Sequence, residues 1–551
     1  MTEPDADVVV IGGGPSGSTA ATMLARKGWR VRLFEREHFP REHIGESLLP
    51  ASIPILQDLG VLPAIEAAGF LHKWGATMVW GASREPWSWY FREGFAGNPH
   101  SFQVWRPQFD QILLENSRAH GVEVFEGHRV LDVLFEGERA AGVRVVADGR
   151  EQTVLARFIV DASGLEGLLG RKLALRQPDE QFRNLAIFAY FTGAERLPPP
   201  DETNIFIESY SDGWTWMIPL HTGWMSVGFV MDSKAGQELI RSKGIEAAYQ
   251  DQLARSTNAA RMLRNGMMVS GPKVIRDWSY LSTEVGGDGY ALVGDAACFI
   301  DPLFSTGVHV ALTAGVLGAA YVTTALKDPG MREATARAYK EVYYQHYQLF
   351  RELARLFYAS NRTIESYFWE MRRVLGAEGD TTPRAAFIRA AAGQPPQGYE
   401  RVVIERGDAP PEFINDLHAA EGARAARQQS LAAIPPKARA GTLLALVPVL
   451  APGARVERMP VLTDGEFVWR FVITTPQRID HPPISPVVAE LIKAIDGQST
   501  VAAILEQKAV GLDEATSGRL AEAAFRTIEI LYIDGIIAEL RGLSPGKARG
   551  R

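Results

Sequence analysis

The chain has 551 residues, more than one hydrophobic core usually holds, which predicts two to four domains or layers. Its formal net charge of -7 leaves no basic excess to neutralise phosphates, which argues against nucleic acid as a partner. The single cysteine, Cys298, excludes an intramolecular disulfide and a cysteine-based metal cluster, and fits a reducing cytoplasm. The acidic start, residues 1–7, shows no signal-peptide pattern, so we expect a cytoplasmic protein. We also expect no metal site.

A nucleotide-binding pattern follows. Residues 7–11 form a β-branched run typical of a strand buried on both faces of a parallel sheet. The glycine-rich run 12–17 comes next, then a predicted helix over 18–27 and a second strand over 30–34 that ends at Glu35. In such a motif one glycine permits the tight turn, a second lets the backbone approach a pyrophosphate, and the acid binds a ribose hydroxyl. The pattern predicts a dinucleotide site with the diphosphate at the helix N-terminus.

A lysine in an apolar setting stands near position 70. Lys73 lies within Phe-Leu-His-Lys-Trp-Gly-Ala, residues 70–76, directly before a predicted strand over 77–80. Most lysines are solvated at the surface, but these neighbours favour a buried position for Lys73. His72 beside it is more typical of a structural or surface residue.

Residues 204–230 predict antiparallel strands. They are rich in Ile, Phe, Trp, Tyr and Val, with turns at 211–213 and 221–223. Within them Trp214 and Trp216 stand two positions apart, shortly before Pro219. On their own, two large aromatics in this spacing favour a buried strand.

Two further runs place polar groups after strands. Residues 290–297 predict a buried strand that ends at Gly294-Asp295, where Asp295 could also be only a helix cap. The run 299–307 opens a helix, and free N–H groups at a helix start can bind an anion without a cationic side chain. The apolar stretch 308–326 approaches transmembrane length, but its polar residues favour a buried helix, so we expect no membrane partner.

The C-terminal part changes character. Residues 334–369 predict a helix with aromatic residues mostly three and four apart, as on a core-facing stripe. A Gly, Pro and Ala-rich stretch at 376–398 predicts a linker or loop. A strand at 467–473 and three helices between 487 and 531 predict a small α+β, winged-helix-like module. Because the chain is acidic, we expect this module to cover the active site or dock a partner.

These features together resemble the flavin-dependent halogenases over roughly residues 5 to 370. The resemblance implies an α/β fold (α+β overall) of the p-hydroxybenzoate-hydroxylase type. A Rossmann-like FAD-binding domain would span 1–335, interleaved with an antiparallel β-sheet substrate layer at about 71–100 and 166–273. A helical segment with its linker would occupy 336–400, and the α+β module 401–551.

The resemblance also implies the cofactor. Residues 104–110 resemble the helix start whose arginine, here Arg106, meets the FAD diphosphate, and Asp295 would bind the ribityl and phosphate region. The cofactor-binding candidates are Gly12, Gly14, Ser16, Gly17, Glu35, Arg36, Arg106, Asp295 and Gly307. No separate nicotinamide fingerprint is seen, so reduced FAD (FADH2) would come from a partner flavin reductase. A few relatives tether the flavin at the position of Asp277, although a noncovalent flavin is the default.

In the chemistry that the resemblance implies, reduced FAD and O₂ form a flavin hydroperoxide that chloride or bromide attacks. The halide would rest at the amides of Thr306 and Gly307, although flavin hydroxylases share much of this loop. The resulting hypohalous acid would travel to Lys73, which holds it by hydrogen bonding or as a haloamine, with Ser305 assisting. The residues expected to separate substrate from flavin are Trp214, Trp216, Pro219 and Phe304.

One departure from the family concerns the substrate. Tryptophan halogenases carry a glutamate where this chain has Phe304. We therefore expect an electron-rich phenol, pyrrole or acyl precursor, free or bound to a carrier protein. A flavin monooxygenase or reductase of the same fold is the alternative, because the run 45–50, Gly-Glu-Ser-Leu-Leu-Pro, occurs in such reductases too. A non-enzymatic flavoprotein whose C-terminal module recruits a carrier protein is a further alternative.

Overall fold

The computed structural model describes residues 3–80, 85–93, 98–276, 279–359, 424–475, 483–510 and 514–543. The chain divides into two compact units, the first made of residues 1–399 with 464–466 and the second of 400–463 with 467–551. Each unit is considered by itself below. Asp277 and the expected linker at 376–398 lie outside the described residues.

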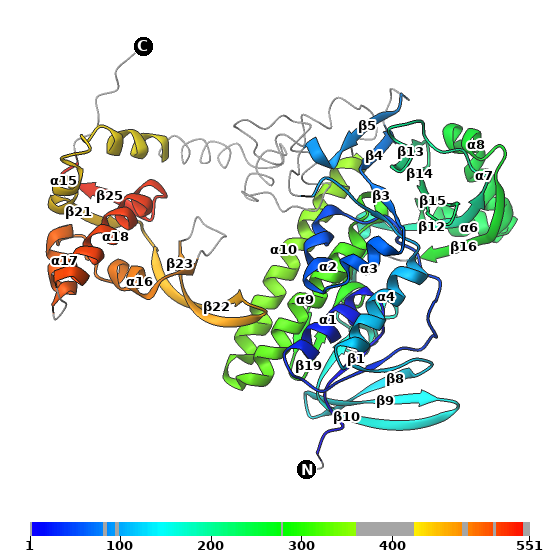
Figure 1. Cartoon of the computed structure of the whole chain (residues 1–551), viewed down its shortest axis with the longest axis horizontal. Coiled ribbons are helices and arrows are strands. Elements are labelled where there is room, and N and C mark those ends of the chain that lie inside the picture. Colours follow the sequence, from blue (N-terminus) through cyan, green and yellow to red (C-terminus); the bar gives the residue numbers. More distant parts are fainter. Residues whose placement is uncertain are drawn as a thin grey trace. The chain divides into compact units, whose positions relative to one another are not determined.

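The first unit contains a mainly parallel sheet that carries the glycine-rich turn (Figure 1). Its strands are, in spatial order, β18 (Gly286–Gly287), β19 (Tyr290–Leu292), β10 (Arg150–Asp161), β1 (Ala6–Ile11), β2 (Val31–Phe34) and β7 (Glu123–Phe125). β1 runs parallel to both β2 and β10, and its Val8, Val9 and Val10 are fully buried. The β-branched run therefore forms the central strand, as its composition predicts.

Helices and a hairpin complete this layer. Helix α1 (Pro15–Arg26) packs against α4 (Arg106–Ala119) and α9 (Thr306–Lys327), and α9 against α10 (Arg332–Ala359). The antiparallel strands β8 (Arg129–Glu136) and β9 (Arg139–Ala147) extend from β10. Shorter elements nearby are α5 (Leu168–Lys172) and the sheet of β11 (Arg176–Pro178), β17 (Tyr280–Ser282) and β20 (Cys298–Phe299). The parallel sheet with packed helices confirms the α/β fold class.

A seven-stranded sheet forms the second layer of this unit. Its strands are, in spatial order, β16 (Met267–Arg276), β12 (Asn184–Thr192), β15 (Trp224–Asp232), β14 (Gly213–Pro219), β13 (Ile205–Tyr210), β4 (Gly75–Val79) and β5 (Trp87–Tyr90). All neighbours are antiparallel except β13 and β4. Segments before position 100 and after position 180 thus build one sheet.

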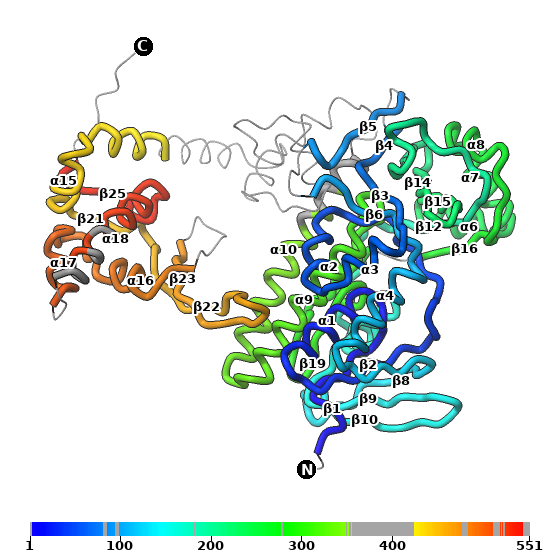
Figure 2. Tube along the Cα trace, viewed as in Figure 1, coloured from blue at the N-terminus to red at the C-terminus, as the bar shows by residue number. Residues whose placement is uncertain are grey.

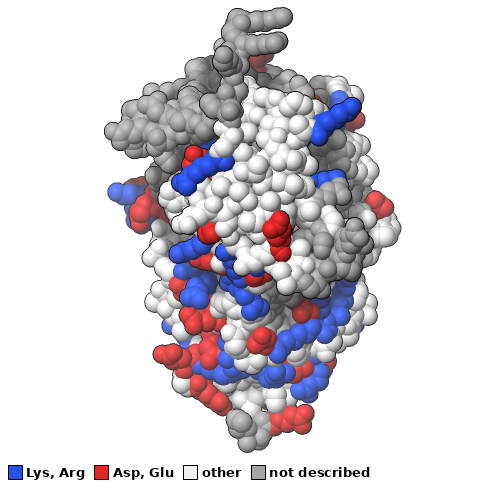
Figure 3. All heavy atoms as spheres, turned by 90° about the vertical axis from the view of Figure 1, so that its left-hand side faces the viewer, with Lys and Arg blue, Asp and Glu red and all other residues white. Residues whose placement is uncertain are grey.

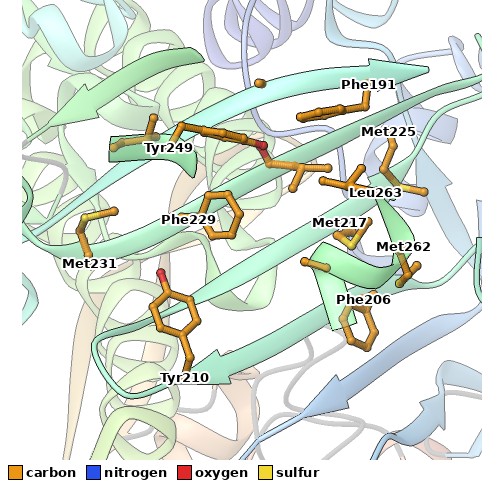
Figure 4. Close-up of a cluster of buried hydrophobic side chains, with 14 of the residues drawn as sticks. Phe191, Phe206, Tyr210, Met217, Met225, Phe229, Met231, Tyr249, Met262 and Leu263 are labelled. Carbon is orange, nitrogen blue, oxygen red and sulfur yellow. The ribbon is translucent and has the colours of Figure 1, made fainter. Parts of the chain in front are cut away.

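One face of this sheet is closed by three helices, α6 (Ser233–Lys243), α7 (Ile245–Arg255) and α8 (Thr257–Met262). Figure 4 shows the cluster between them, in which Met217, Met225 and Phe229 from the strands meet Tyr249 and Met262 from the helices. Because side chains alternate along a strand, the even-numbered residues of β14 point to the opposite face. That face is turned to the layer that contains the parallel sheet and its glycine-rich turn.

A small ribbon connects the two layers. β3 (Leu71–Lys73) pairs antiparallel with β6 (Ser101–Gln103), and residues 46–48 pair with the other edge of β6. The short helices α2 (Ile53–Asp58) and α3 (Leu62–Ala67) follow this segment. Leu48 and Phe102 belong to the core cluster beneath them.

Two long helices close the first unit. α9 is long and apolar enough to span a membrane by length and composition alone, but 89% of its apolar window is buried inside the protein. In α10, the hydroxyl of Tyr339 donates a hydrogen bond to the carbonyl of Leu292, and the hydroxyl of Tyr343 donates one to the carbonyl of Gly294. Its buried aromatics follow the spacing of the predicted stripe, while residues 360–369 lie outside the described part.

The second unit, yellow to red in Figure 2, is a small α+β body. It contains β21 (Val447–Leu450), β22 (Arg455–Thr463), β23 (Glu466–Thr474), β24 (Pro483–Ile484), β25 (Ile537–Arg541), α15 (Arg439–Ala445), α16 (Pro486–Lys493), α17 (Val501–Ala509) and α18 (Glu514–Ile533). Val501, Ile528 and Ile537 lie in its core. Acidic and basic side chains lie interspersed on the protein surface, as the space-filling view in Figure 3 shows.

Candidate active site

The glycine-rich turn lies at the carboxyl end of β1 and at the start of α1. Gly12 has a φ of +100°, a conformation that L side chains rarely adopt, and a Cβ there would overlap the carbonyl of Ala162. A Cβ on Gly17 would overlap the carbonyl of Gly12, so Gly17 allows helix and strand to approach. Gly14 faces a large cavity, where a Cβ would come within 3.3 Å of Arg41 Nη2. The two outer glycines therefore shape the turn, and Gly14 keeps the cavity open.

Glu35 stands at the end of β2 and lines the same cavity. Its Oε2 accepts a hydrogen bond from Gly13 N at 2.8 Å, and its Oε1 accepts one from Glu37 N at 2.9 Å. The carboxylate therefore holds the turn in place. Ser16 also lines the cavity, and Arg36 lies at its rim in an ion pair with Glu166 at 2.6 Å.

Two arginines face the turn from other elements. Arg106, at the start of α4, is 3% exposed and donates to both carboxylate oxygens of Asp110 at 2.7 and 2.8 Å, and also to the carbonyl of Ile44. Burial alone would raise the pKa of Asp110, but the charge and hydrogen bonds of Arg106 hold it below its usual value. Asp110 is thus anionic, and it orients Arg106 toward the cavity.

Arg41 is a site residue that no sequence motif singled out. Its Nη1 lies 3.3 Å from the Asp110 carboxylate, yet this buried atom has no hydrogen-bond partner within the described part of the chain. A buried donor without a hydrogen-bond partner is costly. The other terminal nitrogen of the same guanidinium, Nη2, lies beside Gly14 at the N-terminus of α1. Open backbone, a helix start and an unsatisfied guanidinium suit a diphosphate. A positively charged residue six positions after Glu35 was the available signal in the sequence.

Asp295 closes the far side of the cavity. It follows β19 directly after Gly294, whose φ is +60°. Burial raises the pKa of Asp295 to about 6, and the nearby charges of Arg106 and Arg176 oppose that rise. The carboxyl group can therefore accept or donate a hydrogen bond near neutral pH.

Lys73 and Ser305, which are 232 positions apart, lie side by side. Lys73 is 2% exposed, and its Nζ donates to Leu48 O at 3.2 Å and to Ser305 Oγ at 3.4 Å. The ring centre of Phe91 lies 5.4 Å from Nζ. Burial lowers the pKa of Lys73 to about 7, because a charged ammonium loses its hydration in this setting. The amine can therefore change its protonation state near neutral pH.

The residues before α9 form a sharp turn that leads into the helix. Ser305 has a φ of +59° and caps both a 3₁₀ turn at 302–304 and α9. Thr306 and Gly307 are the first residues of α9, where backbone N–H groups have no partner within the helix. Ser305 and Gly307 line the cavity, whereas Thr306 and Phe304 are buried beside it and are not lining residues.

Trp214 and Trp216 line the cavity from β14, together with Ile218. The indole N–H of Trp216 lies 3.3 Å from Ser226 Oγ. Met217 points the other way into the core of Figure 4. Pro219 shares the odd-numbered positions of β14 and is not a lining residue.

A buried carboxylate within the run 45–50 was also not assigned a place from sequence. Glu46 is 1% exposed and lines the cavity, where it accepts from Gly45 N at 3.0 Å and from the Tyr190 hydroxyl at 2.8 Å. Burial and the Glu46 charge raise the pKa of Tyr190, so the phenol stays protonated and donates. Among the described residues, no group of three or more His, Cys, Asp or Glu is placed to hold a metal.

The chain is similar to proteins of one enzyme class. A family model described as tryptophan halogenase matches residues 92–400, and one described as FAD dependent oxidoreductase matches residues 7–171. The tryptophan 2-halogenase of Chondromyces crocatus is 37% identical over 376 residues, 67% of this chain and 71% of that protein. The 1H-pyrrole-2-carbonyl-(peptidyl-carrier protein) chlorinase of Pseudomonas fluorescens is 33% identical over 401 residues, 68% of this chain and 88% of that protein.

A solved structure extends the similarity to the second unit. The flavin-dependent halogenase CmlS is 26% identical, with a TM-score of 0.67, and the match covers 97% of this chain and 96% of CmlS. The similarity therefore continues beyond position 400, where the sequence resemblance fades.

Proposed function

The chain belongs to the flavin-dependent halogenases, and on that premise we propose that it relays hypohalous acid through Lys73 to an electron-rich aromatic precursor. It is an enzyme that uses FAD, supplied reduced, together with halide and O₂. The relay is supported most directly by one observation: a buried lysine with a pKa of about 7 lies beside Ser305 at the start of α9.

Bound reduced FAD would, with O₂ and halide, supply the hypohalous acid. The protein residues would bind and orient the components. The cavity-lining residues that would hold FAD are Gly12, Gly14, Ser16, Glu35, Arg36, Arg106, Asp295 and Gly307, and Arg41 joins this set. Gly17 does not line the cavity and would act by letting helix and strand approach. The free amides of Thr306 and Gly307 would hold the halide, because a helix start favours an anion.

Lys73 would receive the hypohalous acid. Its Nζ can donate a hydrogen bond as an ammonium or carry halogen as an amine, and Ser305 Oγ holds it in position. Trp214 and Trp216 would form the wall that keeps the organic substrate away from FAD. Phe304 would add apolar packing behind that wall and Pro219 would end the strand, since neither is a lining residue.

For the substrate we propose a phenol, pyrrole or related natural-product precursor, free or carrier-bound. The absence of a carboxylate at Phe304 supports a substrate that supplies its own activation. The chlorinase relative is named for a pyrrolyl group on a carrier protein, which supports a carrier-bound substrate. The relative named tryptophan 2-halogenase supports tryptophan as a second candidate. A flavin reductase is the proposed partner, and the cytoplasm the proposed compartment, since the sole cysteine is free and buried.

The test is an assay with a flavin reductase, NADH, O₂ and bromide or chloride. Phenols, pyrroles in free and carrier-bound form, and tryptophan are offered in parallel, and a scavenger traps hypohalous acid. We expect halogenated phenol or pyrrole and trapped hypohalous acid that depends on halide. Hydroxylated product alone, unaffected by halide, would instead identify a monooxygenase.

A further inference from the structure

Three charged side chains form an ion-pair bridge at the rim of the cofactor cavity. The Glu166 carboxylate accepts from Arg36 Nη1 at 2.6 Å through Oε2, and from Arg129 Nη2 at 3.5 Å through Oε1. All three residues line the cavity. The side chains of Glu166, Arg36 and Arg129 are also 28%, 52% and 59% exposed. Residues that both line a cavity and face solvent stand at its opening, so the bridge lies at the mouth.

The bridge spans the carboxyl end of the central strand. β1 lies between β2 and β10, and Ile11 at its end pairs with both Phe34 and Asp161. Arg36 follows shortly after the end of β2, and Glu166 shortly after the end of β10. Strands that are two apart in a sheet lie about 10 Å from each other. The bond between Arg36 and Glu166 therefore crosses the crevice at the end of β1, where the glycine-rich turn begins.

The two sides of this crevice carry opposite charges. On the β2 side, Glu35 O accepts a hydrogen bond from His128 N at 2.8 Å, which brings the start of β8 and Arg129 close to Arg36. Glu166 stands on the β10 side, in the turn after that strand. Each carboxylate oxygen of Glu166 thus meets one arginine from the facing side. The bridge ties together segments that are otherwise separated by the cavity mouth.

The turn that carries Glu166 is anchored by its backbone. The carbonyl of Leu165 accepts from Arg176 Nη1 at 2.9 Å and from Arg171 Nη2 at 3.3 Å. Because the backbone is held, the bridge opens by rotation of the exposed side chains, without movement of the fold. Exposed ion pairs are individually weak and are screened by salt. Such a bridge suits a closure that opens and closes often.

We propose that Glu166 closes the cavity over the nucleotide end of FAD and sets the rate at which flavin is exchanged with solution. The proposal rests on the halogenase function proposed above, in which reduced FAD arrives from a partner reductase. Glu35, the predicted partner of the FAD ribose, directly precedes Arg36, so the ribose would lie beneath the bridge. Opening the bridge leaves two cations at the mouth, and these attract the FAD diphosphate. No covalent bond changes when the bridge opens or closes.

The bridge is tested by removing its negative charge. FAD binding and release by Glu166→Gln are followed through flavin fluorescence, without turnover. We expect FAD to leave this variant about three to five times faster than wild type, as loss of an exposed ion-pair network predicts. FAD should bind at least as fast as it does to wild type, because Arg36 and Arg129 remain available as cations. Release at the wild-type rate, or slower binding, overturns the proposal.

The salt dependence of release identifies the ion pair as the cause. Salt screens exposed charges, so higher ionic strength should open the bridge in wild type. FAD release should therefore accelerate more with salt in wild type than in Glu166→Gln, where no bridge is left to screen. The attraction between FAD and the remaining arginines is common to both proteins and cancels in this comparison. An equal salt response in the two proteins overturns the proposal.

Glu37→Gln is the matched control. The Glu37 carboxylate lies 3.5 Å from Arg36 Nε, and the two residues are neighbours on the β2 side. This substitution removes the same charge from the same arginine but leaves the bond across the crevice intact. FAD release and its salt response should equal those of wild type. Release as fast as in Glu166→Gln would show that any charge lost near Arg36 has this effect, and would overturn the proposal.

A crystal structure of the holoenzyme adds a readout that does not depend on rates. It should show Glu166 within ion-pair distance of Arg36, with the FAD nucleotide enclosed beneath them. A Glu166 side chain turned to solvent above bound FAD overturns the proposal. The closure and the function fail differently. Wild-type protein that binds no FAD refutes the cofactor assignment, whereas normal halogenation with unchanged FAD release from Glu166→Gln refutes only the closure.

Discussion

The indole of Trp216 lies directly over Gly228 of the neighbouring strand, so closely that a Cβ on Gly228 would overlap the ring. Trp216 can line the cofactor cavity only because β15 has no side chain at this point. The cavity wall therefore depends on Gly228 as well as on Trp216, because Gly228 leaves the space that the indole occupies.

Gly228→Ala should therefore displace Trp216. Overpacking a buried site of this kind costs about 1–3 kcal/mol, so we expect a lower free energy of unfolding and a shifted tryptophan fluorescence. FAD affinity and halogenation should fall with it. Gly271→Ala in β16 is the matched control, since a Cβ there meets nothing within 4 Å. Equal effects of the two substitutions would show that the wall does not depend on Gly228.

Gly14→Val should abolish FAD retention while the chain remains folded. A Cβ at Gly14 already comes within 3.3 Å of Arg41 Nη2, and a valine would fill the space beside the N-terminus of α1. FAD binding is measured by flavin fluorescence and the fold by circular dichroism. Unchanged FAD affinity would show that the FAD diphosphate does not bind at this turn.

Lys73→Ala should lose substrate halogenation while O₂ consumption continues and trapped hypohalous acid is still found. Lys73→Arg should not restore transfer, because a guanidinium stays protonated and cannot readily carry halogen on nitrogen. Lys340→Ala serves as the control, since Lys340 forms a surface ion pair with Glu284. Normal halogenation by Lys73→Ala, or loss of FAD in this variant, would show that Lys73 has a structural role and does not relay hypohalous acid.

The buried Lys73 should also make stability depend on pH. Its pKa is about 7 in the folded protein, below the ordinary lysine value of about 10.4, so the unfolded chain binds the proton more tightly. The folded state is penalised in full below pH 7, and the penalty is relieved as pH rises from about 7 toward 10. Lys73→Met should therefore be more stable than wild type at pH 6 by roughly a few kcal/mol.

Chemical unfolding of both proteins across this range measures that difference. We expect the advantage of Lys73→Met to narrow steadily as pH rises above 7. A difference that does not change with pH would mean that Lys73 is not desolvated in the folded protein.

The dinucleotide turn was predictable because its requirements are local. A β-branched strand, glycines at close backbone approaches and an acid after the next strand lie within about thirty residues, and each follows from backbone conformation or burial of nearby atoms. The apolar neighbours of Lys73 likewise predicted its burial, which is confirmed. The α/β class followed from the same strand and helix patterns.

Other features depend on contacts between distant segments. Local sequence around Lys73 does not indicate Ser305, whose place beside the lysine was expected only from the family resemblance. Nothing near Gly14 in the chain indicates Arg41, because tertiary packing brings that pair together. Ser47 lies opposite Gln103, and Lys73 opposite Ser101, only because three separate segments pair in one register. Sequence by itself determined the turns, the strands and the buried lysine, since short-range periodicity and backbone freedom govern them. The tertiary structure alone decided which side chains meet, because strand pairing is chosen by the free energy of the whole fold.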